Sequence, residues 1–190
     1  MRAACLLLFI AGCAAPTSRT AGADLGGDRP DLEDVGRLVH REANRARHDL
    51  EVAVLRWSDR LARAARSHSL DMANHDYFAH ESRDGRSPSD RAEEAGVECR
   101  VEMGRERYRT GVLENLFVTT AYESVREQQL GSRTERSVDW FTPREIASET
   151  VRSWLDSPGH RRNLLDGTAS RQGVGVAVRD DRIFITQVLC

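Results

Sequence analysis

Apolar residues recur at helical spacing in three stretches of the chain, residues 31–46, 59–72 and 142–155. Side chains three and four positions apart share one face of a helix, so each stretch predicts an amphipathic helix that buries one side. The first stretch begins at Asp31 and the second follows Ser58, and both residue types favour the start of a helix. The pattern therefore predicts three long helices.

Two shorter signals mark further helix boundaries. Ser87 and Thr142 each precede a proline and stand three residues before an acid, Asp90 and Glu145, which is the pattern of a capping box. The first signal predicts a short helix, and the second starts the last long one. The Pro-Gly pair at 158–159 predicts the end of that helix, because proline cannot continue the hydrogen-bond ladder.

Strand patterns occupy the second half of the chain. Residues 96–104 and 112–120 contain β-branched residues and alternate in part. Residues 174–178 and 183–185 alternate on either side of an Arg-Asp-Asp-Arg turn, which predicts an antiparallel hairpin. Residues 121–139 are polar and aperiodic, and we expect a long surface loop there. Helices combined with a few antiparallel strands indicate the α+β class.

The chain begins with a targeting segment. A basic residue precedes the apolar run 6–11, which is far too short to cross a membrane. The run leads into Ile-Ala-Gly-Cys at 10–13, which resembles the lipobox of bacterial lipoproteins. This resemblance implies that residues 1–12 are a lipoprotein signal peptide and that Cys13 is acylated on its thiol and its amine. An ordinary secretory signal, cut near Ala15, is the alternative.

Residues 13–30 lack periodicity and contain many small residues, which predicts a lipidated flexible tether before a domain at 31–190. Several acyl chains on one residue make a stable membrane anchor. Ala14 stands where an aspartate would retain a lipoprotein in the inner membrane. The expected location is the bacterial cell envelope, at the outer membrane if the source is Gram-negative.

Two cysteines remain after the signal peptide and the lipidated residue are set aside. Cys99 and Cys190 would lie in an oxidising compartment, where disulfides form and persist. We favour a Cys99–Cys190 disulfide. Two separate buried thiols are the alternative, because sequence spacing does not define connectivity.

Composition narrows the class of partner. The chain has 190 residues, a formal net charge of −2 and no lysine, so all of its permanent cations are arginines. A general nucleic-acid binder would carry a basic surface, and we expect no nucleic-acid partner. The arginine clusters near 60–66 and 105–109 are typical of solvated faces.

Candidate chemistry lies in separated short segments. His80 stands two residues before a serine, His160 follows the last long helix, and Glu114 is flanked by apolar residues. A carboxylate in apolar surroundings needs a partner, and the two histidines are candidates for it. Two imidazoles and a carboxylate form a mixed nitrogen and oxygen site suited to Zn²⁺. No HExxH zinc motif, G-x-S-x-G nucleophile motif or phosphate-binding glycine loop is present.

Five motifs occur in order along the chain: "ANRAR…LRW", "LARAARSHSLDMANHDYFAHESRDGRSPSDRAEEAG", "ENL", "TVRSWLDSPGHRRNLLD" and "GVGVAV…FITQV". Together they resemble the CAP superfamily, which comprises cysteine-rich secretory proteins, antigen 5 and pathogenesis-related proteins and is also called the SCP domain. The resemblance is to its bacterial branch and covers residues 35–189. It implies an α-β-α sandwich with a short antiparallel sheet between helical layers.

The same resemblance implies a cavity with a tetrad of two histidines and two acids. His80, Glu114 and His160 match three of the four positions. Ser157 stands at the fourth, and Asp156 is adjacent but differs in helical phase by about 100°. The alternative for His160 is a solvent-facing polar residue. Residues outside the tetrad are expected to be scaffold, structural or exposed: Asn44, Arg47, Trp57, Trp154, Asn163, His68 and His75.

Three functions are compatible with this pattern. The first is a non-enzymatic envelope module that binds a lipid, glycan or protein at the cavity and its groove. The second is a divalent-metal-dependent hydrolase, a peptidase or a peptidoglycan-acting enzyme, with Glu114 as the base and the histidines as ligands. The third is a purely structural role. We favour binding, because no nucleophile or oxyanion donor is identifiable.

Overall fold

A computed structural model of the chain describes residues 34–190. The predicted signal peptide, the tether with Cys13 and the predicted helix start at Asp31 lie outside the described residues, and they stay predictions. None of the helices in this described part is long and apolar enough to span a membrane.

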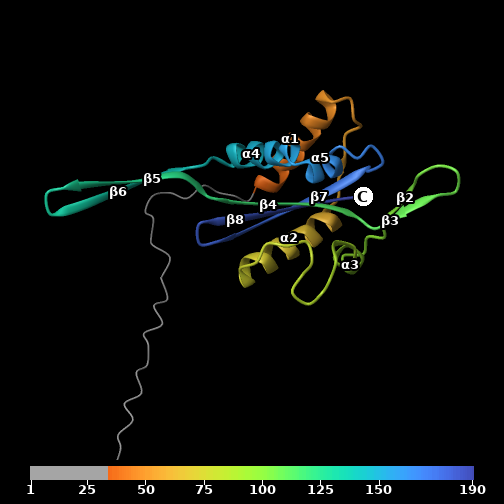
Figure 1. Cartoon of the computed structure of the whole chain (residues 1–190), viewed down its shortest axis with the longest axis horizontal. Helices are drawn as coiled ribbons and strands as arrows, with labels where there is room; N and C mark the ends of the chain where they lie inside the picture. Colours follow the sequence, from red (N-terminus) through yellow and green to blue (C-terminus); the bar gives the residue numbers. More distant parts are fainter. Residues whose placement is uncertain (1–33) are drawn as a thin grey trace, which may run out of the picture.

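A four-stranded sheet forms the middle layer of the protein (Figure 1). Strands β7, β8 and β4 are antiparallel neighbours, whereas the short β1 pairs in parallel with the start of β7. The predicted hairpin is β7–β8, with Asp180 and Asp181 in its turn. In sheet order, the bounds are β1 Arg56–Trp57, β7 Arg171–Arg179, β8 Arg182–Leu189 and β4 Leu113–Thr120.

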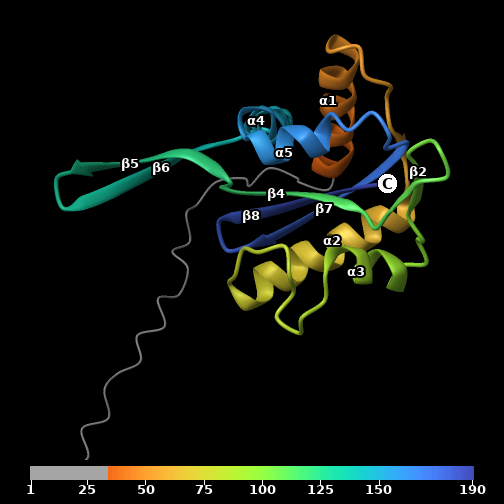
Figure 2. The ribbon, with the colours of Figure 1, turned by 45° about the vertical axis from the view of Figure 1, so that its right-hand side comes forward.

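Helices cover both faces of this sheet (Figure 2). One layer contains α1 (Val35–Asp49), α4 (Pro143–Asp156) and α5 (Pro158–Leu164). The other contains α2 (Asp59–His75) and α3 (Pro88–Glu94). This arrangement confirms the predicted α+β class and the α-β-α sandwich.

Each helical layer buries its own apolar core against the sheet. On the α1 and α4 side, Val39, Trp154 and Ile185 belong to one fully buried cluster. On the other side, Leu61 and Val188 belong to a second cluster. The helical periodicity of the sequence therefore corresponds to faces that lie on the sheet.

Two glycines of β7 allow α2 to approach the sheet closely. A Cβ atom built on Gly173 would lie 2.0 Å from the amide nitrogen of Ala62. One built on Gly175 would lie 2.0 Å from the amide nitrogen of Arg66. Any side chain at these positions would collide with helix backbone, which explains why glycines alternate with valines in this strand.

The helix caps agree with the sequence patterns. The capping boxes of Ser87 with Asp90 and of Thr142 with Glu145 are both formed, each with proline in the first turn. The last long helix ends at Asp156, as expected from the proline that follows. Pro158 then starts a further short helix, α5, which the sequence pattern did not predict. Proline fits the first helical position because its missing N–H has no partner there.

Two hairpins extend from the sandwich. The first joins β2 (Arg100–Glu102) to β3 (Tyr108–Thr110), and the second joins β5 (Tyr122–Leu130) to β6 (Arg133–Trp140). The loop predicted for 121–139 is therefore wrong. The β5–β6 ribbon projects away from the sheet, so most of its residues are exposed on both faces (Figure 1). Such a ribbon needs no alternation of apolar and polar residues, which is the signal that identifies a half-buried strand.

Cys99 and Cys190 form a disulfide, with Cα atoms 5.6 Å apart. Both residues are buried in the core cluster beneath α2. The bond joins the segment after α3 to the last residue of the chain, which are 91 positions apart in sequence. It therefore closes a long loop around the sheet.

Replacing both cysteines by alanine should lower the free energy of unfolding by about 4 kcal/mol, because the crosslink restricts the unfolded chain. Denaturant unfolding of the variant and the oxidised parent measures this difference. Reduction of the parent should produce a similar loss. Equal unfolding midpoints for all three samples would show that the bond does not stabilise the fold.

Candidate functional site

Glu114 is the buried acid of the candidate site, with 2% of its side chain exposed. It lies on β4, and it shares the α2 face of the sheet with its register partner Val188. Its Oε2 accepts a hydrogen bond from Nη2 of Arg91 at 2.7 Å. Its Oε1 accepts one from Nδ1 of His80 at 2.9 Å. Both carboxylate oxygens are thus engaged, as a buried charge requires.

Arg91 on α3 organises the loop that carries His80. Its Nη2 also donates to the carbonyl oxygen of His80, and its Nη1 donates to Oγ of Ser82 and to the carbonyl oxygen of Arg86, each at 2.9 Å. One buried guanidinium therefore holds both the main chain of the loop and the acid. Nothing in the sequence distinguished Arg91: the apolar neighbours of Glu114 predicted a partner for it, but the arginine resembles any other polar residue of a helix.

His68 supports the site from the interior. Its side chain is fully buried, and its Nε2 lies 2.9 Å from the carbonyl oxygen of Ala79 and 3.9 Å from Oε1 of Glu114. Burial lowers the pKa of His68 below its usual value. His75 is half-exposed and paired with Asp71, away from this cluster. These positions agree with the structural or exposed roles expected for the two histidines.

His160 lies on α5 and reaches the site from the opposite helical layer. Its ring centroid is 6.5 Å from that of His80, and the two planes are inclined at 61°. Burial lowers the pKa of His160, and the charge of nearby His80 adds to this effect. At neutral pH the His160 imidazole is therefore uncharged and presents one donor and one acceptor nitrogen.

Three polar residues fix the position of α5. Arg47 is buried on α1, and its Nη1 donates to the carbonyl oxygen of Leu164 at 2.7 Å. Asn163 Nδ2 donates to the carbonyl oxygen of Glu114 at 3.0 Å, and Asn115 Nδ2 donates to that of His160 at 3.1 Å. These bonds attach the short helix to β4 and so define where His160 lies. Arg161 and Arg162 on the same helix remain exposed.

A chain of buried amides continues from the site across the sheet. Asn115 donates to Oε1 of Gln187 at 2.9 Å, and Gln187 donates to Gln172. Gln172 in turn contacts Nδ1 of His40 at 2.9 Å. The three amides are fully buried. A glutamine within the apolar run of β8 was the sequence signal for this network, and the sequence analysis did not use it.

The donor set does not fit a metal ion. Within residues 34–190, no group of three or more histidine, cysteine, aspartate or glutamate side chains is arranged to hold one. Glu114 is bonded to a cation, Arg91, which would repel a divalent ion. Ser157, at the fourth tetrad position, is the N-cap of α5, and Asp156 is exposed. The residues instead form a hydrogen-bonded pair of imidazole and acid, with a second imidazole opposite.

The structure thus brings His80, Glu114 and His160 to one place at the β4 edge of the sheet. His80 comes from the loop between α2 and α3, and His160 comes from α5 in the other helical layer; Figure 2 shows these elements on opposite sides of β4. The two rings nevertheless lie with their centroids 6.5 Å apart. Direct contact with Glu114 is made by His80 and Arg91. Of the two histidines considered as partners of the acid, His80 bonds to it directly, and Arg91 adds a permanent positive charge that the sequence did not indicate.

Two solved structures with a similar fold are, by their titles, an extracellular and an outer surface protein of bacteria. An extracellular protein containing an SCP domain from Bacillus anthracis str. Ames is 24% identical, with a TM-score of 0.52, covering 82% of this chain and 39% of its own. An outer surface protein from Borrelia burgdorferi is 14% identical, with a TM-score of 0.56, covering 86% of this chain and 97% of its own. At these identities the similarity shows the fold.

Sequence comparison defines the family. The uncharacterized membrane protein YlbC of Bacillus subtilis (strain 168) is 32% identical over 144 residues, which are 75% of this chain. The match covers only 30% of that longer protein. The model of the cysteine-rich secretory protein family, CAP, matches residues 40–189, which include both histidines and the acid of the site. The chain therefore belongs to the cysteine-rich secretory protein (CAP) family.

Proposed function

We propose that the protein is a non-enzymatic binding module of the bacterial cell envelope, which holds a lipid, glycan or protein ligand between His80 and His160. The observation that carries this proposal is the saturated state of Glu114. Both of its oxygens accept hydrogen bonds, from Arg91 and His80. Its role is to orient the ring of His80, and the two imidazoles remain as the groups that meet a ligand.

Hydrolysis is disfavoured by the same geometry. A general base must be free to take a proton from water or from a nucleophile within hydrogen-bond reach. The carboxylate of Glu114 is 2% exposed and paired with a permanent cation. Its contacts match those of an orienting group better than those of a base. A metal-dependent reaction would further need a ligand set that the described side chains do not form.

The chemistry of the site favours a polar ligand group. The side chain of His80 is 53% exposed, so its ring edge is accessible. His160 is partly buried, and its lowered pKa keeps it neutral at pH 7. Two imidazoles at this spacing can donate to and accept from one hydroxyl, amide or water between them. Hydroxyls of a glycan, amides of a peptide and headgroups of a lipid all supply such groups.

The proposed location combines the N-terminal sequence with the relatives. Names of the relatives include an extracellular protein, an outer surface protein and a membrane protein. The Ile-Ala-Gly-Cys run at 10–13 would place this domain at a membrane through acyl chains on Cys13. A tether at 13–30 would then leave the site between His80 and His160 accessible to envelope components.

The binding proposal predicts a specific effect of the two site histidines. Purified protein should co-sediment with one of two envelope preparations, peptidoglycan sacculi or vesicles of envelope lipids, or capture an envelope protein. The double variant His80→Ala, His160→Ala should bind at least about tenfold more weakly, since it loses two direct hydrogen bonds. The matched control His48→Ala, His75→Ala removes two exposed histidines elsewhere and should bind like the parent.

Calorimetry with Zn²⁺ provides the opposing test. We expect no saturable heat in the parent that disappears in the His80→Ala, His160→Ala variant, because Arg91 already neutralises Glu114. A stoichiometric zinc site that depends on both histidines would contradict the proposal and favour the metal-dependent hydrolase. Equal binding of envelope material by the parent and the double variant would show that the two imidazoles do not contribute to binding.

The lowered pKa of His160 predicts a dependence of stability on pH. The unfolded chain binds a proton near pH 6.5, but folded His160 binds it only at lower pH, so acidification through this window favours unfolding. His40 and His68, whose pKa values are also lowered, contribute in the same direction. The free energy of unfolding should decrease as the pH is lowered below 6.5. His160→Gln should make this dependence on pH less steep. Denaturant titrations at successive pH values measure both, and an unchanged slope would contradict the shift.

The anchor is tested by metabolic labelling with a palmitate analogue in a bacterial host. Label should attach to the parent and be absent from Cys13→Ala, because the acylated thiol is removed. Cys5→Ala, in the predicted signal peptide, is the matched control and should still become labelled. Equal label on the parent and Cys13→Ala would exclude the lipoprotein assignment and leave an ordinary secretory signal.

A further inference from the structure

The two edges of the sheet differ in how their main-chain groups are satisfied. At the β4 edge, side chains cap the outward carbonyls: Asn163 donates to that of Glu114 and Trp154 Nε1 to that of Leu116, at 3.0 and 2.9 Å. At the other edge, β1 pairs only with the first two residues of β7. Among residues 34–190, no other strand pairs with the outer side of β7.

A hydrogen bond from the start of α2 shows which main-chain N–H and C=O groups of β7 point away from β8. Ser58 N donates to the carbonyl oxygen of Gln172 at 2.8 Å, so this residue points away from β8. Because the direction of main-chain groups alternates along a strand, the N–H and C=O groups of Val174, Val176 and Val178 also point away from β8. Gly36 of α1 covers the first of them, because a Cβ built there would lie 3.2 Å from the Val174 oxygen. Val176 and Val178 form the open part of the edge.

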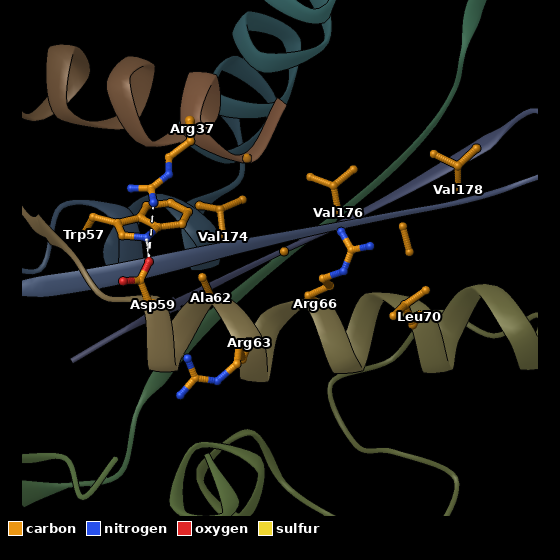
Figure 3. A pocket seen from close by; sticks show the side chains of 13 residues that line it. Arg37, Trp57, Asp59, Ala62, Arg63, Arg66, Leu70, Val174, Val176 and Val178 are labelled. Carbon is orange, nitrogen blue, oxygen red and sulfur yellow. Dashed lines mark hydrogen bonds and ion pairs between the residues drawn. The ribbon is translucent and has the colours of Figure 1, made fainter. Parts of the chain in front are cut away.

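This open edge forms the floor of a groove between α1 and α2, with a volume of about 740 Å³. That volume lies within the range of about 300–1,000 Å³ that is typical of ligand clefts. Figure 3 shows Val176 and Val178 along the strand, Leu70 on α2 beneath them, and Trp57 at the α1 end. Val178 is an exposed apolar residue, with 42% of its surface accessible. An exposed apolar edge strand is a template for another strand.

The charge of the groove is positive. Arg66 rises from α2 toward the strand beside Val176 (Figure 3), and its guanidinium has no hydrogen-bond or ion-pair partner among residues 34–190. Arg37 lies over the ring of Trp57 at 3.9 Å and is paired with Asp59 at 3.4 Å. Arg63 also lines the groove without a partner among residues 34–190, but Figure 3 shows it directed away from the strand. Arg66 therefore stands next to the unpaired main-chain groups, which favours an acidic partner.

We propose that the open edge of β7 binds an extended acidic segment of another protein by strand addition. The segment pairs its main chain with the N–H and C=O groups of Val176 and Val178. On one face its apolar side chains lie with these valines. On the other, an acidic side chain meets Arg66. Main-chain bonds then provide affinity, and the alternation of apolar and acidic residues provides specificity.

The probe is a short, blocked and fluorescently labelled peptide of alternating valine and glutamate, titrated into the full-length protein. It should bind saturably and slow the exchange of the amide hydrogens of Val176 and Val178. The same peptide with alternate backbone nitrogens methylated keeps its charge and side chains but loses the strand hydrogen bonds, so it should not bind. A valine and lysine peptide should not bind either, because Arg66 repels it.

Two protein variants test the two parts of the contact. Arg66→Glu should weaken peptide binding at least about tenfold, because the pair becomes repulsive. Arg41→Glu is its matched control, an exposed arginine of α1 outside this groove. Val178→Pro removes one outward N–H and leaves the bonds to β8 intact, whereas Val178→Thr keeps the N–H and the shape. Only the proline variant should bind the peptide more weakly.

The proposal is overturned if the parent does not bind the valine and glutamate peptide. It is also overturned if the methylated peptide binds equally, because strand pairing is then not the mode of contact. Vesicles containing phosphatidylglycerol form the last arm. If the vesicles bind the parent but not Arg66→Glu, and the peptide does not displace them, the groove binds lipid and the strand-addition proposal is overturned. Peptide binding with loss in Arg66→Glu and Val178→Pro, and retention in both controls, supports strand addition.

Discussion

The buried pair of Arg91 and Glu114 is the contact on which the site depends. The pair joins α3 to the edge strand β4, and the same guanidinium fixes the loop of His80 through main-chain and Ser82 contacts. Removing one member would leave an unpaired buried charge, which costs about 3–5 kcal/mol. Local folding and site geometry are therefore coupled: the loop reaches its position only where acid and cation are together.

Much of the fold follows from local patterns in the sequence. The long helices, both capping boxes and the β7–β8 hairpin combine periodicity with residues that favour one backbone geometry, so neighbouring residues suffice to predict them. The β5–β6 ribbon was not predictable in this way. It packs little against the core, and its pairing is stabilised across strands rather than by a buried face.

The site residues required a different kind of information. His80, Glu114 and His160 are far apart in sequence, and only the order of family motifs indicated that they meet. Arg91 and the amides of Asn115 and Gln187 carried no motif, because their roles arise from tertiary burial. Burial predicts that each polar group has a partner, but it does not identify the partner until the strands and helices are placed.

The two edges of one sheet give this small domain two surfaces of different chemistry. At β4, Asn163 and Trp154 donate hydrogen bonds to the outward carbonyls of the strand. The groups left for the proposed ligand there are the imidazole side chains. At β7, no such caps exist among residues 34–190, and the glycines that admit α2 leave Arg66 beside the open strand. Since β8 lies between these strands, occupation of one surface does not obstruct the other. The two proposed binding modes therefore use different groups of the same sheet: side chains at the β4 edge and main-chain groups at the β7 edge.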